Sequence, residues 1–321
     1  MPDAVQNAVE PSQEFDFTSA DGLRIACARW EGGCPLRGVI QIAHGMGEHY
    51  GRYGQAIVAL AAAGFMVYAN DHRGHGRTAS PLNSFGDFGE GGFDLLVDDM
   101  LRLSRIAKEE NPGLPLILLG HSMGSFAAQQ YALIQSRAID ALVLSGTGIL
   151  DGLANIARTN ANGTVPLNAS FEPARTPFDW LTRDRAVVDA FVDDPLCFAE
   201  LMPASAASFL AAADRLSNPS LLRSIRPDLP VYVFAGSDDP VGQELEGVCT
   251  LLQRYRQAGV NDLSHDFYVG GRHEMLNEIN RDEVMTNLNG WLARMLSERR
   301  LSTRRARLHL VDHTHATADR R

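Results

Sequence analysis

Short, largely apolar runs that alternate with amphipathic helical patterns constrain the fold of this chain more than any other feature. A continuous aliphatic run of strand length is typical of a strand buried on both faces of a sheet. Such runs occupy residues 39–43, 65–69, 114–119, 141–145, 231–235 and 266–269. Helical patterns lie between most of them, at residues 53–63, 93–109, 123–134 and 244–257. The alternation predicts an α/β fold with a mostly parallel sheet covered by helices on both faces.

One long interval interrupts this rhythm. Between residues 145 and 231 there is no buried strand pattern, only the loop-like N-A-N-G-T-V-P-L-N and then short, alanine-rich helical patterns. An insertion of this length between two core strands predicts a helical cap over the carboxyl edge of the sheet, where open α/β sheets bind ligands. At the other end, residues 14–18 and 23–29 flank S-A-D-G and predict a leading antiparallel hairpin.

These patterns divide the chain into four expected parts. The expected parts are a flexible N-terminus (1–13), an α/β core (14–146 and 228–298), a cap (147–227) and a disordered basic tail (299–321).

Composition excludes several classes of protein. With 45% hydrophobic and 21% charged residues the chain is ordinary globular material, and its net charge of −10 disfavours a nucleic-acid surface. No apolar run reaches the roughly 18 residues that a membrane span needs, and the start has no apolar signal-peptide core, so we expect a cytoplasmic protein. The four cysteines lack zinc-site spacing and are expected to be reduced thiols. No metal and no cofactor is expected.

A serine lies where the run 114–119 gives way to the helical pattern 123–134. The sequence there is G-H-S-M-G, residues 120–124. A sharp strand-to-helix turn of this kind lifts the hydroxyl of Ser122 clear of the sheet and leaves backbone N–H groups beside it. The alternative is a small residue in a tight turn, so the nucleophile hypothesis depends on finding a base and an acid that orients the base.

Candidate partners follow two later strands. The run 231–235 is followed by G-S-D-D-P-V, which offers Asp238 and Asp239, and the run 266–269 is followed by G-G-R-H-E-M, which offers His273. The carboxyl ends of parallel strands share one edge of a sheet, so these side chains are expected on the same side as Ser122. The order serine, acid, histidine is the one this architecture uses.

An acyl-transfer site also needs two N–H donors for the oxyanion. Met123, directly after the serine, would supply one, and Met46 in the loop H-G-M-G-E-H would supply the other. Gly45 and Gly47 let this backbone approach a substrate. The alternative is a tight turn without a role. The histidines at 44, 49, 72 and 75 lie in glycine-rich loops without carboxylates or cysteines at metal spacing, which favours turn geometry over a metal site.

Taken together, the motifs resemble the α/β-hydrolase superfamily, and within it the monoacylglycerol lipases and bacterial lysophospholipase-like serine hydrolases. The matching segments are H-G-M-G-E-H-Y-G-R-Y (44–53), Y-A-N-D-H-R-G-H-G (68–76), G-H-S-M-G-S (120–125), T-P-F-D-W-L-T-R-D (176–184), G-S-D-D-P-V (236–241) and G-G-R-H-E-M-L-N-E (270–278). The resemblance implies a triad of Ser122, Asp239 and His273 with Met46 and Met123 as oxyanion donors. It selects Asp239 over Asp238, because the acid of the family is the fourth residue of its G-S-x-D segment.

The expected activity is hydrolysis of carboxylic esters of single-chain lipids, of the monoacylglycerol or lysophospholipid type. An aminopeptidase, a thioesterase or a perhydrolase would use the same triad, and a ligand-binding homologue without catalysis is the remote alternative. The cap departs from the family at D-P-L-C-F-A (194–199), where the bacterial branch often has glycine after the cysteine, so acyl-chain preference stays open. Transient contact of the cap with a membrane surface is compatible with the sequence, which leaves the oligomeric state open.

Overall fold

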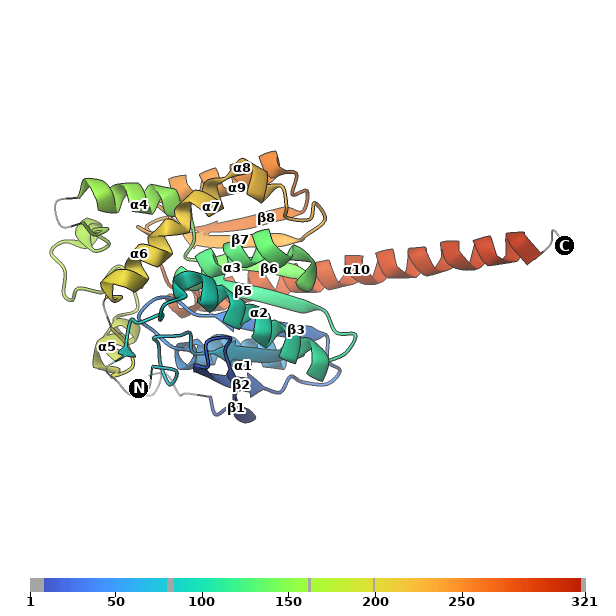
Figure 1. Cartoon of the computed structure of the whole chain (residues 1–321), viewed down its shortest axis with the longest axis horizontal. Helices are drawn as coiled ribbons and strands as arrows, with labels where there is room; N and C mark the ends of the chain where they lie inside the picture. The colour runs from blue at the N-terminus through green and yellow to red at the C-terminus, as the bar shows by residue number, and fades with distance from the viewer. Residues whose placement is uncertain (1–8, 80–83, 161–162, 199, 319–321) are drawn as a thin grey trace. The chain divides into compact units, whose positions relative to one another are not determined.

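A computed structural model describes residues 9–79, 84–160, 163–198 and 200–318, and contains one eight-stranded sheet (Figure 1). The strand order is β1-β2-β4-β3-β5-β6-β7-β8. The pairs β1/β2 and β2/β4 are antiparallel and all other neighbours are parallel. The strands are β1 (Gln13–Thr18), β2 (Arg24–Trp30), β3 (Gly38–Ala43), β4 (Phe65–Asn70), β5 (Leu116–His121), β6 (Ala141–Ser145), β7 (Val231–Gly236) and β8 (Leu263–Tyr268).

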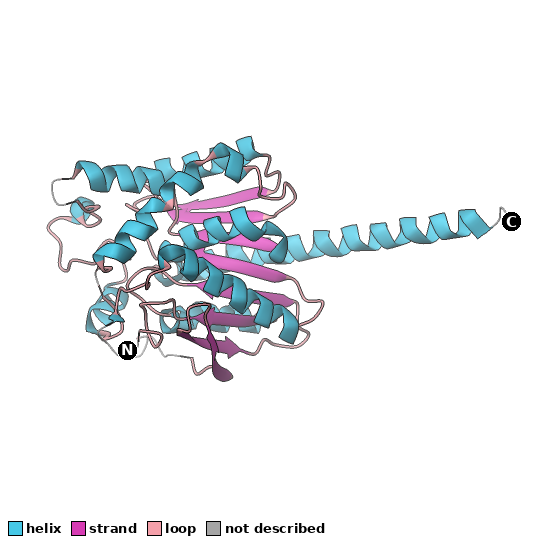
Figure 2. Ribbon diagram, viewed as in Figure 1, coloured by secondary structure: helices cyan, strands magenta, loops and turns pink. Residues whose placement is uncertain are grey.

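Helices connect the strands on both sides of this sheet (Figure 2). The α-helices are α1 (Gly54–Ala62), α2 (Gly92–Glu110), α3 (Met123–Gln135), α4 (Leu150–Thr159), α5 (Arg185–Asp193), α6 (Pro203–Ala211), α7 (Ala213–Ser217), α8 (Pro219–Leu222), α9 (Glu246–Ala258) and α10 (Arg281–Ala318). Short 3₁₀ helices are η1 (Tyr50–Tyr53), η3 (Ser136–Ala138), η4 (Ala169–Phe171) and η5 (Met275–Asn277).

The strand order decides which face each connecting helix covers. From β3 the chain moves one way along the sheet to β4, and from β4 it moves the other way to β5. Because parallel crossovers are right-handed, α1 and α2 lie on opposite faces. The helices α3 and α9 share the direction and therefore the face of α2, and α2 packs beside α3 in front of the sheet in Figure 1. The reversal makes a topological switch point between β3 and β5, where α/β sheets bind ligands.

The predicted α/β class and mostly parallel sheet are confirmed, and the differences lie in particular segments. β8 begins three residues earlier than the run at 266–269 indicates, because its mixed sequence L-S-H-D-F-Y lies at a sheet edge and carries no continuous apolar signal. Helix α4 was not predicted, although its buried residues Leu150, Leu153 and Ala157 lie at helical spacing. Of the expected flexible segment 1–13, residues 1–8 lie outside the described residues, and the Val9 carbonyl accepts a hydrogen bond from the Trp30 indole.

The expected disordered tail differs most. The structure continues α10 to Ala318, and residues 319–321 lie outside the described part. Arginine, leucine and alanine are strong helix formers, and neither glycine nor proline occurs after Gly290, so the sequence holds no signal that would end the helix. The prediction of disorder for residues 299–321 rested on their lack of apolar periodicity and left out their intrinsic helix propensity.

The chain divides into two compact units, Met1–Arg281 and Asp282–Arg321. The expected cap falls inside the first unit together with the sheet, and its residues form α4 to α8. None of the helices in the described residues has the length and apolarity needed to cross a membrane.

Candidate active site

Ser122 lies in a strained turn between β5 and α3. Its φ is 52° and its ψ −124°, a conformation that costs a non-glycine residue free energy and persists only where the surrounding packing imposes it. The packing is visible at the two flanking glycines. A Cβ at Gly124 would lie 2.2 Å from the Ala43 carbonyl oxygen, and a Cβ at Gly120 would lie 2.4 Å from the Gly124 oxygen. The G-x-S-x-G spacing therefore lets the turn fit against β3.

Asp239 and His273 lie together after β7 and β8. The Nδ1 of His273 donates to Oδ1 of Asp239 over 2.9 Å, and the same oxygen accepts the Val241 N–H at 2.9 Å. Both side chains are buried, with exposed fractions of 2% for His273 and 0% for Asp239. Asp238, the other candidate acid, is exposed and bonds to the Ser237 hydroxyl. The geometry thus pairs the histidine with Asp239.

The surroundings of His273 set its basicity. Burial disfavours the charged ring and lowers the pKa, but the carboxylate of Asp239, assisted by Glu274 and Glu48, outweighs burial and raises the pKa above its ordinary value. The rings of Trp180 and His121 both pack against the His273 ring, each with a distance of 4.7 Å between the ring centroids. Burial and the neighbouring His273 lower the pKa of His121 to about 4, so this second histidine is neutral near pH 7.

The two predicted oxyanion donors border the same space as the serine. Met46, Ser122, Met123 and His273 all line one cavity of about 710 Å³. Met123 is the first residue of α3, and an N–H at that position has no acceptor within its helix. Gly45 packs closely against Ser122, and only glycine fits there without crowding, because a Cβ at Gly45 would lie 3.0 Å from the Ser122 Cβ.

A buried charged group beside this cavity was missed by the sequence analysis. The guanidinium of Arg52 donates to Glu48 at 2.9 Å and to both carboxylate oxygens of Glu274, at 2.5 and 2.8 Å. Glu48 Oε1 also accepts the Gly45 N–H at 2.6 Å and the Tyr53 hydroxyl at 2.6 Å. Burial would raise the pKa of Glu48, but Arg52 keeps it below the ordinary value. The i,i+4 spacing of Glu48 and Arg52 was the available signal, whereas Glu274 lies 222 residues away.

The rest of the cavity is mainly apolar and is formed largely by the predicted cap. Its apolar lining includes Phe126, Leu150, Leu153, Val165, Leu167, Phe178, Trp180, Leu181, Phe191, Phe198, Leu201, Phe209 and Leu210. A mostly apolar cavity with a few convergent polar groups is the usual form of a small-molecule site. Its chemistry fits a substrate with a long hydrocarbon part.

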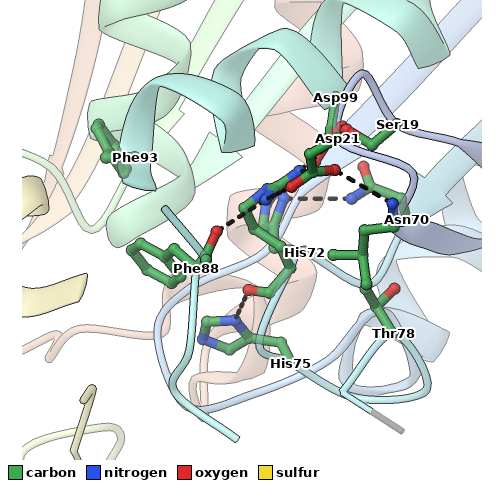
Figure 3. Close-up of polar contacts among 12 residues, drawn as sticks. Ser19, Asp21, Asn70, His72, His75, Thr78, Phe88, Phe93 and Asp99 are labelled. Carbon is green, nitrogen blue, oxygen red and sulfur yellow. Dashed lines mark hydrogen bonds and ion pairs between the residues drawn. The ribbon is translucent and has the colours of Figure 1, made fainter. Parts of the chain in front are cut away.

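Three further histidines lie close to the oxyanion loop but are engaged in packing. Burial lowers the pKa of His44 and of His75 to about 3, and that of His72 well below its usual range. The backbone N–H of His72 donates to Nε2 of His44 at 2.8 Å. This hydrogen bond fixes His44, the first residue of the loop H-G-M-G-E-H that carries Met46. Figure 3 shows His75 directed to the backbone carbonyl of Arg73, 3.0 Å away. Neutral, mutually packed rings indicate a structural role.

One group of metal-type ligands comes together among the described residues, namely His49, Asp194 and Cys197. The Nε2 of His49 lies 2.9 Å from Oδ2 of Asp194, and its Nδ1 accepts the Gly51 N–H at 3.2 Å. A neutral ring that accepts at Nδ1 carries its proton on Nε2, where it donates to the carboxylate. Both ring nitrogens of His49 are thus used in hydrogen bonds, and neither lone pair is left to bind a metal. All four cysteines are free thiols.

Most of the chain is similar to known hydrolases and lipases. The family described as "Serine aminopeptidase, S33" matches residues 35–280. A monoacylglycerol lipase of Mycolicibacterium smegmatis is 31% identical over 281 residues, 87% of this chain and 96% of that protein. A monoglyceride lipase of Mus musculus is 27% identical over 290 residues, 88% of this chain and 90% of that protein. A thermostable carboxyl esterase from Bacillus coagulans matches with a TM-score of 0.81 at 29% identity, over 90% of this chain and 100% of that structure.

Proposed function

We propose that this chain, which belongs to the α/β-hydrolase family described as serine aminopeptidase, S33, is a serine hydrolase of the carboxylic esters of single-chain lipids. The observation that carries the proposal is the shared cavity. Ser122, His273, Met46 and Met123 all line one largely apolar space of about 710 Å³. Similarity to monoacylglycerol lipases over most of the chain supports a monoacylglycerol-type substrate.

The mechanism follows from the chemistry of these groups. His273, oriented by Asp239, takes the proton of the Ser122 hydroxyl as the serine oxygen attacks the ester carbonyl. The N–H groups of Met46 and Met123 hold the oxyanion of the tetrahedral intermediate. The histidinium then protonates the departing alcohol, which leaves an acyl-enzyme. Water, deprotonated by the same ring, attacks the acyl-enzyme and releases the fatty acid.

The cap, residues 147–227 in our assignment, supplies most of the acyl-binding wall. Val192 and Met202 in this part of the chain are about half exposed, at 49% and 45%. We propose that the cytoplasmic enzyme draws its substrate from lipid surfaces by brief contact through this region. Apolar side chains that stay exposed beside a lipid-binding cavity support such a contact.

The aminopeptidase in the family description is the second candidate. To bind the charged amine of a peptide, the site needs a carboxylate that is not already paired with a cationic side chain. Glu48 and Glu274 are both bonded to Arg52, which leaves Glu172 and Glu200, exposed at the cavity, as the available acidic groups. The buried charges therefore favour a neutral ester over an aminoacyl amide.

Labelling and a substrate panel test the proposal. We expect a fluorophosphonate to modify Ser122, located by mass spectrometry, and Ser122→Ala to lose at least about a thousandfold in kcat. Monoacylglycerols, lysophospholipids, p-nitrophenyl esters, thioesters and aminoacyl amides would be assayed side by side. An unlabelled Ser122, or an alanine variant that keeps its activity, would disprove the mechanism. Turnover of aminoacyl amides alone would establish the peptidase instead.

A further inference from the structure

The loop that carries the proposed oxyanion donor Met46 is held from outside by one segment of the cap. This segment runs from Asp194 to Phe198, directly after α5, and contacts the loop at Gly47 and His49, one and three residues after Met46. It ends at Phe198, the position after D-P-L-C at which the bacterial branch of the family often has glycine.

The first contact is a hydrogen bond between two side chains. Nε2 of His49 lies 2.9 Å from Oδ2 of Asp194, and both side chains are largely buried, with 15% and 24% exposed. The other carboxylate oxygen accepts the Leu196 N–H at 2.9 Å, and the Asp194 carbonyl accepts the Cys197 N–H at 3.0 Å. Asp194 therefore fixes both its own turn and the histidine of the loop.

The second contact joins two backbones. The Phe198 N–H donates to the Gly47 carbonyl at 3.0 Å, and Gly47 has a φ of 72°. A Cβ at Gly47 would lie 2.0 Å from the Phe198 carbonyl oxygen, so the cap backbone fills the space that a side chain would need. The Phe198 ring continues this contact, stacking on Phe85 at 5.5 Å and packing on His75 at 5.0 Å.

The core holds the same loop from inside. Glu48 accepts the Gly45 N–H, and Nδ1 of His44 lies 2.7 Å from the Gly45 carbonyl oxygen, so the core fixes the residue before Met46 while the cap holds the residue after it. The N–H of Met46 must point at the oxyanion within a few tenths of an ångström, and its direction depends on both neighbours. Loss of the cap contact leaves Met46 held from the Gly45 side alone.

We propose that Asp194 is a positioning residue, through which the docked cap aligns the oxyanion donor on the core. The cap then has a second task besides binding the acyl chain, since catalysis on any ester requires it to be in place. This inference rests on the proposed function. It differs from a cap that only binds lipid in what it predicts for small substrates.

The test compares a short ester, p-nitrophenyl acetate, with a long-chain monoacylglycerol. For Asp194→Ala we expect kcat to fall about tenfold on both esters, less than the 10²- to 10³-fold typical of deleting an oxyanion donor. Asp194→Asn keeps an acceptor for His49 and should recover most of the loss. Asp193→Ala, an exposed neighbour at the end of α5, is the matched control and should behave as wild type.

A double-mutant cycle separates positioning from general destabilisation. His49→Ala should reproduce Asp194→Ala, and the double variant should be no slower than either single variant, because one contact is lost in all three. Should Asp194→Ala unfold, as judged by its thermal midpoint, His49→Ala compared with Asp194→Asn carries the test. An increase in KM for the long ester alone, with p-nitrophenyl acetate turnover unchanged, overturns the inference. A wild-type protein that hydrolyses neither ester refutes the proposed function instead.

Discussion

At the scale of single residues, the behaviour of His273 depends on two opposing influences. Burial favours the neutral ring, and the carboxylate of Asp239 favours the charged ring and prevails, so the pKa is raised. A base works only when neutral. The pH at which activity declines on acidification therefore reports how strongly Asp239 acts on His273.

We expect the acid limb of kcat/KM for an ester to have an apparent pKa above the usual value of about 6.5 for histidine. In Asp239→Asn only the weaker influence of Glu274 and Glu48 opposes burial, so the limb should move to lower pH, while kcat falls by about 10⁴ through loss of the correct tautomer. Asp238→Asn, the exposed neighbour, should keep the wild-type profile, measured by pH–rate titration. The opposite pattern would transfer the acid role to Asp238.

Residues that motifs mark were predictable from sequence, and residues that act through burial were not. The candidates Ser122, Asp239 and His273 follow three different strands, and parallel topology places such ends at one edge. Glu48 and Glu274, by contrast, are charged residues that composition assigns to the surface. Only the fold reveals that Arg52 binds both Glu48 and Glu274, the second of which lies 222 residues further along the chain.

At the scale of elements, the turn from β5 into α3 requires a residue without a side chain at position 124. Gly124 sits at the first turn of α3, where a Cβ would meet the Ala43 oxygen at 2.2 Å and the His44 oxygen at 2.4 Å. Both atoms are backbone and cannot rotate away. A helix that begins directly at the sheet edge thus requires glycine at this position.

Gly124→Ala should therefore destabilise the protein by about 3 kcal/mol, because α3 has to move off β3. The same substitution at Gly290, exposed within α10 with no atom within 4 Å of the added Cβ, should stabilise it by up to about 1 kcal/mol. Urea unfolding of the two variants measures the contrast. Equal effects at both sites would contradict the steric argument.

Elements were predicted well where one physical signal dominates. The continuous apolar runs identified the central strands because those strands are buried on both faces, as the fully buried β3 and β5 illustrate. The start of β8 was missed because this edge strand has a mixed sequence, and its structure is decided by tertiary neighbours, which periodicity does not encode. Helix α4 was missed although its buried residues Leu150, Leu153 and Ala157 have helical spacing.

At the scale of the whole molecule, buried histidines couple stability to pH. Four of them have pKa values lowered by burial: His44, His72, His75 and His121. The unfolded chain binds protons at these sites below about pH 6.5, whereas the folded protein does so only at much lower pH. Their contribution to stability is therefore complete above about pH 6.5 and is lost as the pH falls. Asp71, whose pKa burial raises to about 6, acts in the opposite direction.

We expect the thermal midpoint to fall steadily from pH 7 to pH 4.5, because the lowered pKa values of the four histidines outweigh the raised pKa values of Asp71, Asp99 and His273. His75→Phe removes one titrating group while keeping an aromatic ring beside Phe88 and Phe198, so the fall should become shallower. Differential scanning calorimetry across this range measures the slope. A midpoint independent of pH, or a slope unchanged by His75→Phe, would contradict this account.

The neighbouring positions of β6 and β7 limit how enzymes of this kind diversify. The two strands are parallel and hydrogen-bonded, so the chain between them has to return from one edge of the sheet to the other, which takes a dozen residues or more. The segment from α7 to α8, which packs on α9, makes this return. The preceding stretch, from α4 to α6, carries no such obligation. Outside the segment from Asp194 to Phe198, which contacts the loop that carries Met46, this stretch is therefore free to change in sequence and length, so substrate choice can alter while the return path and the sheet are kept.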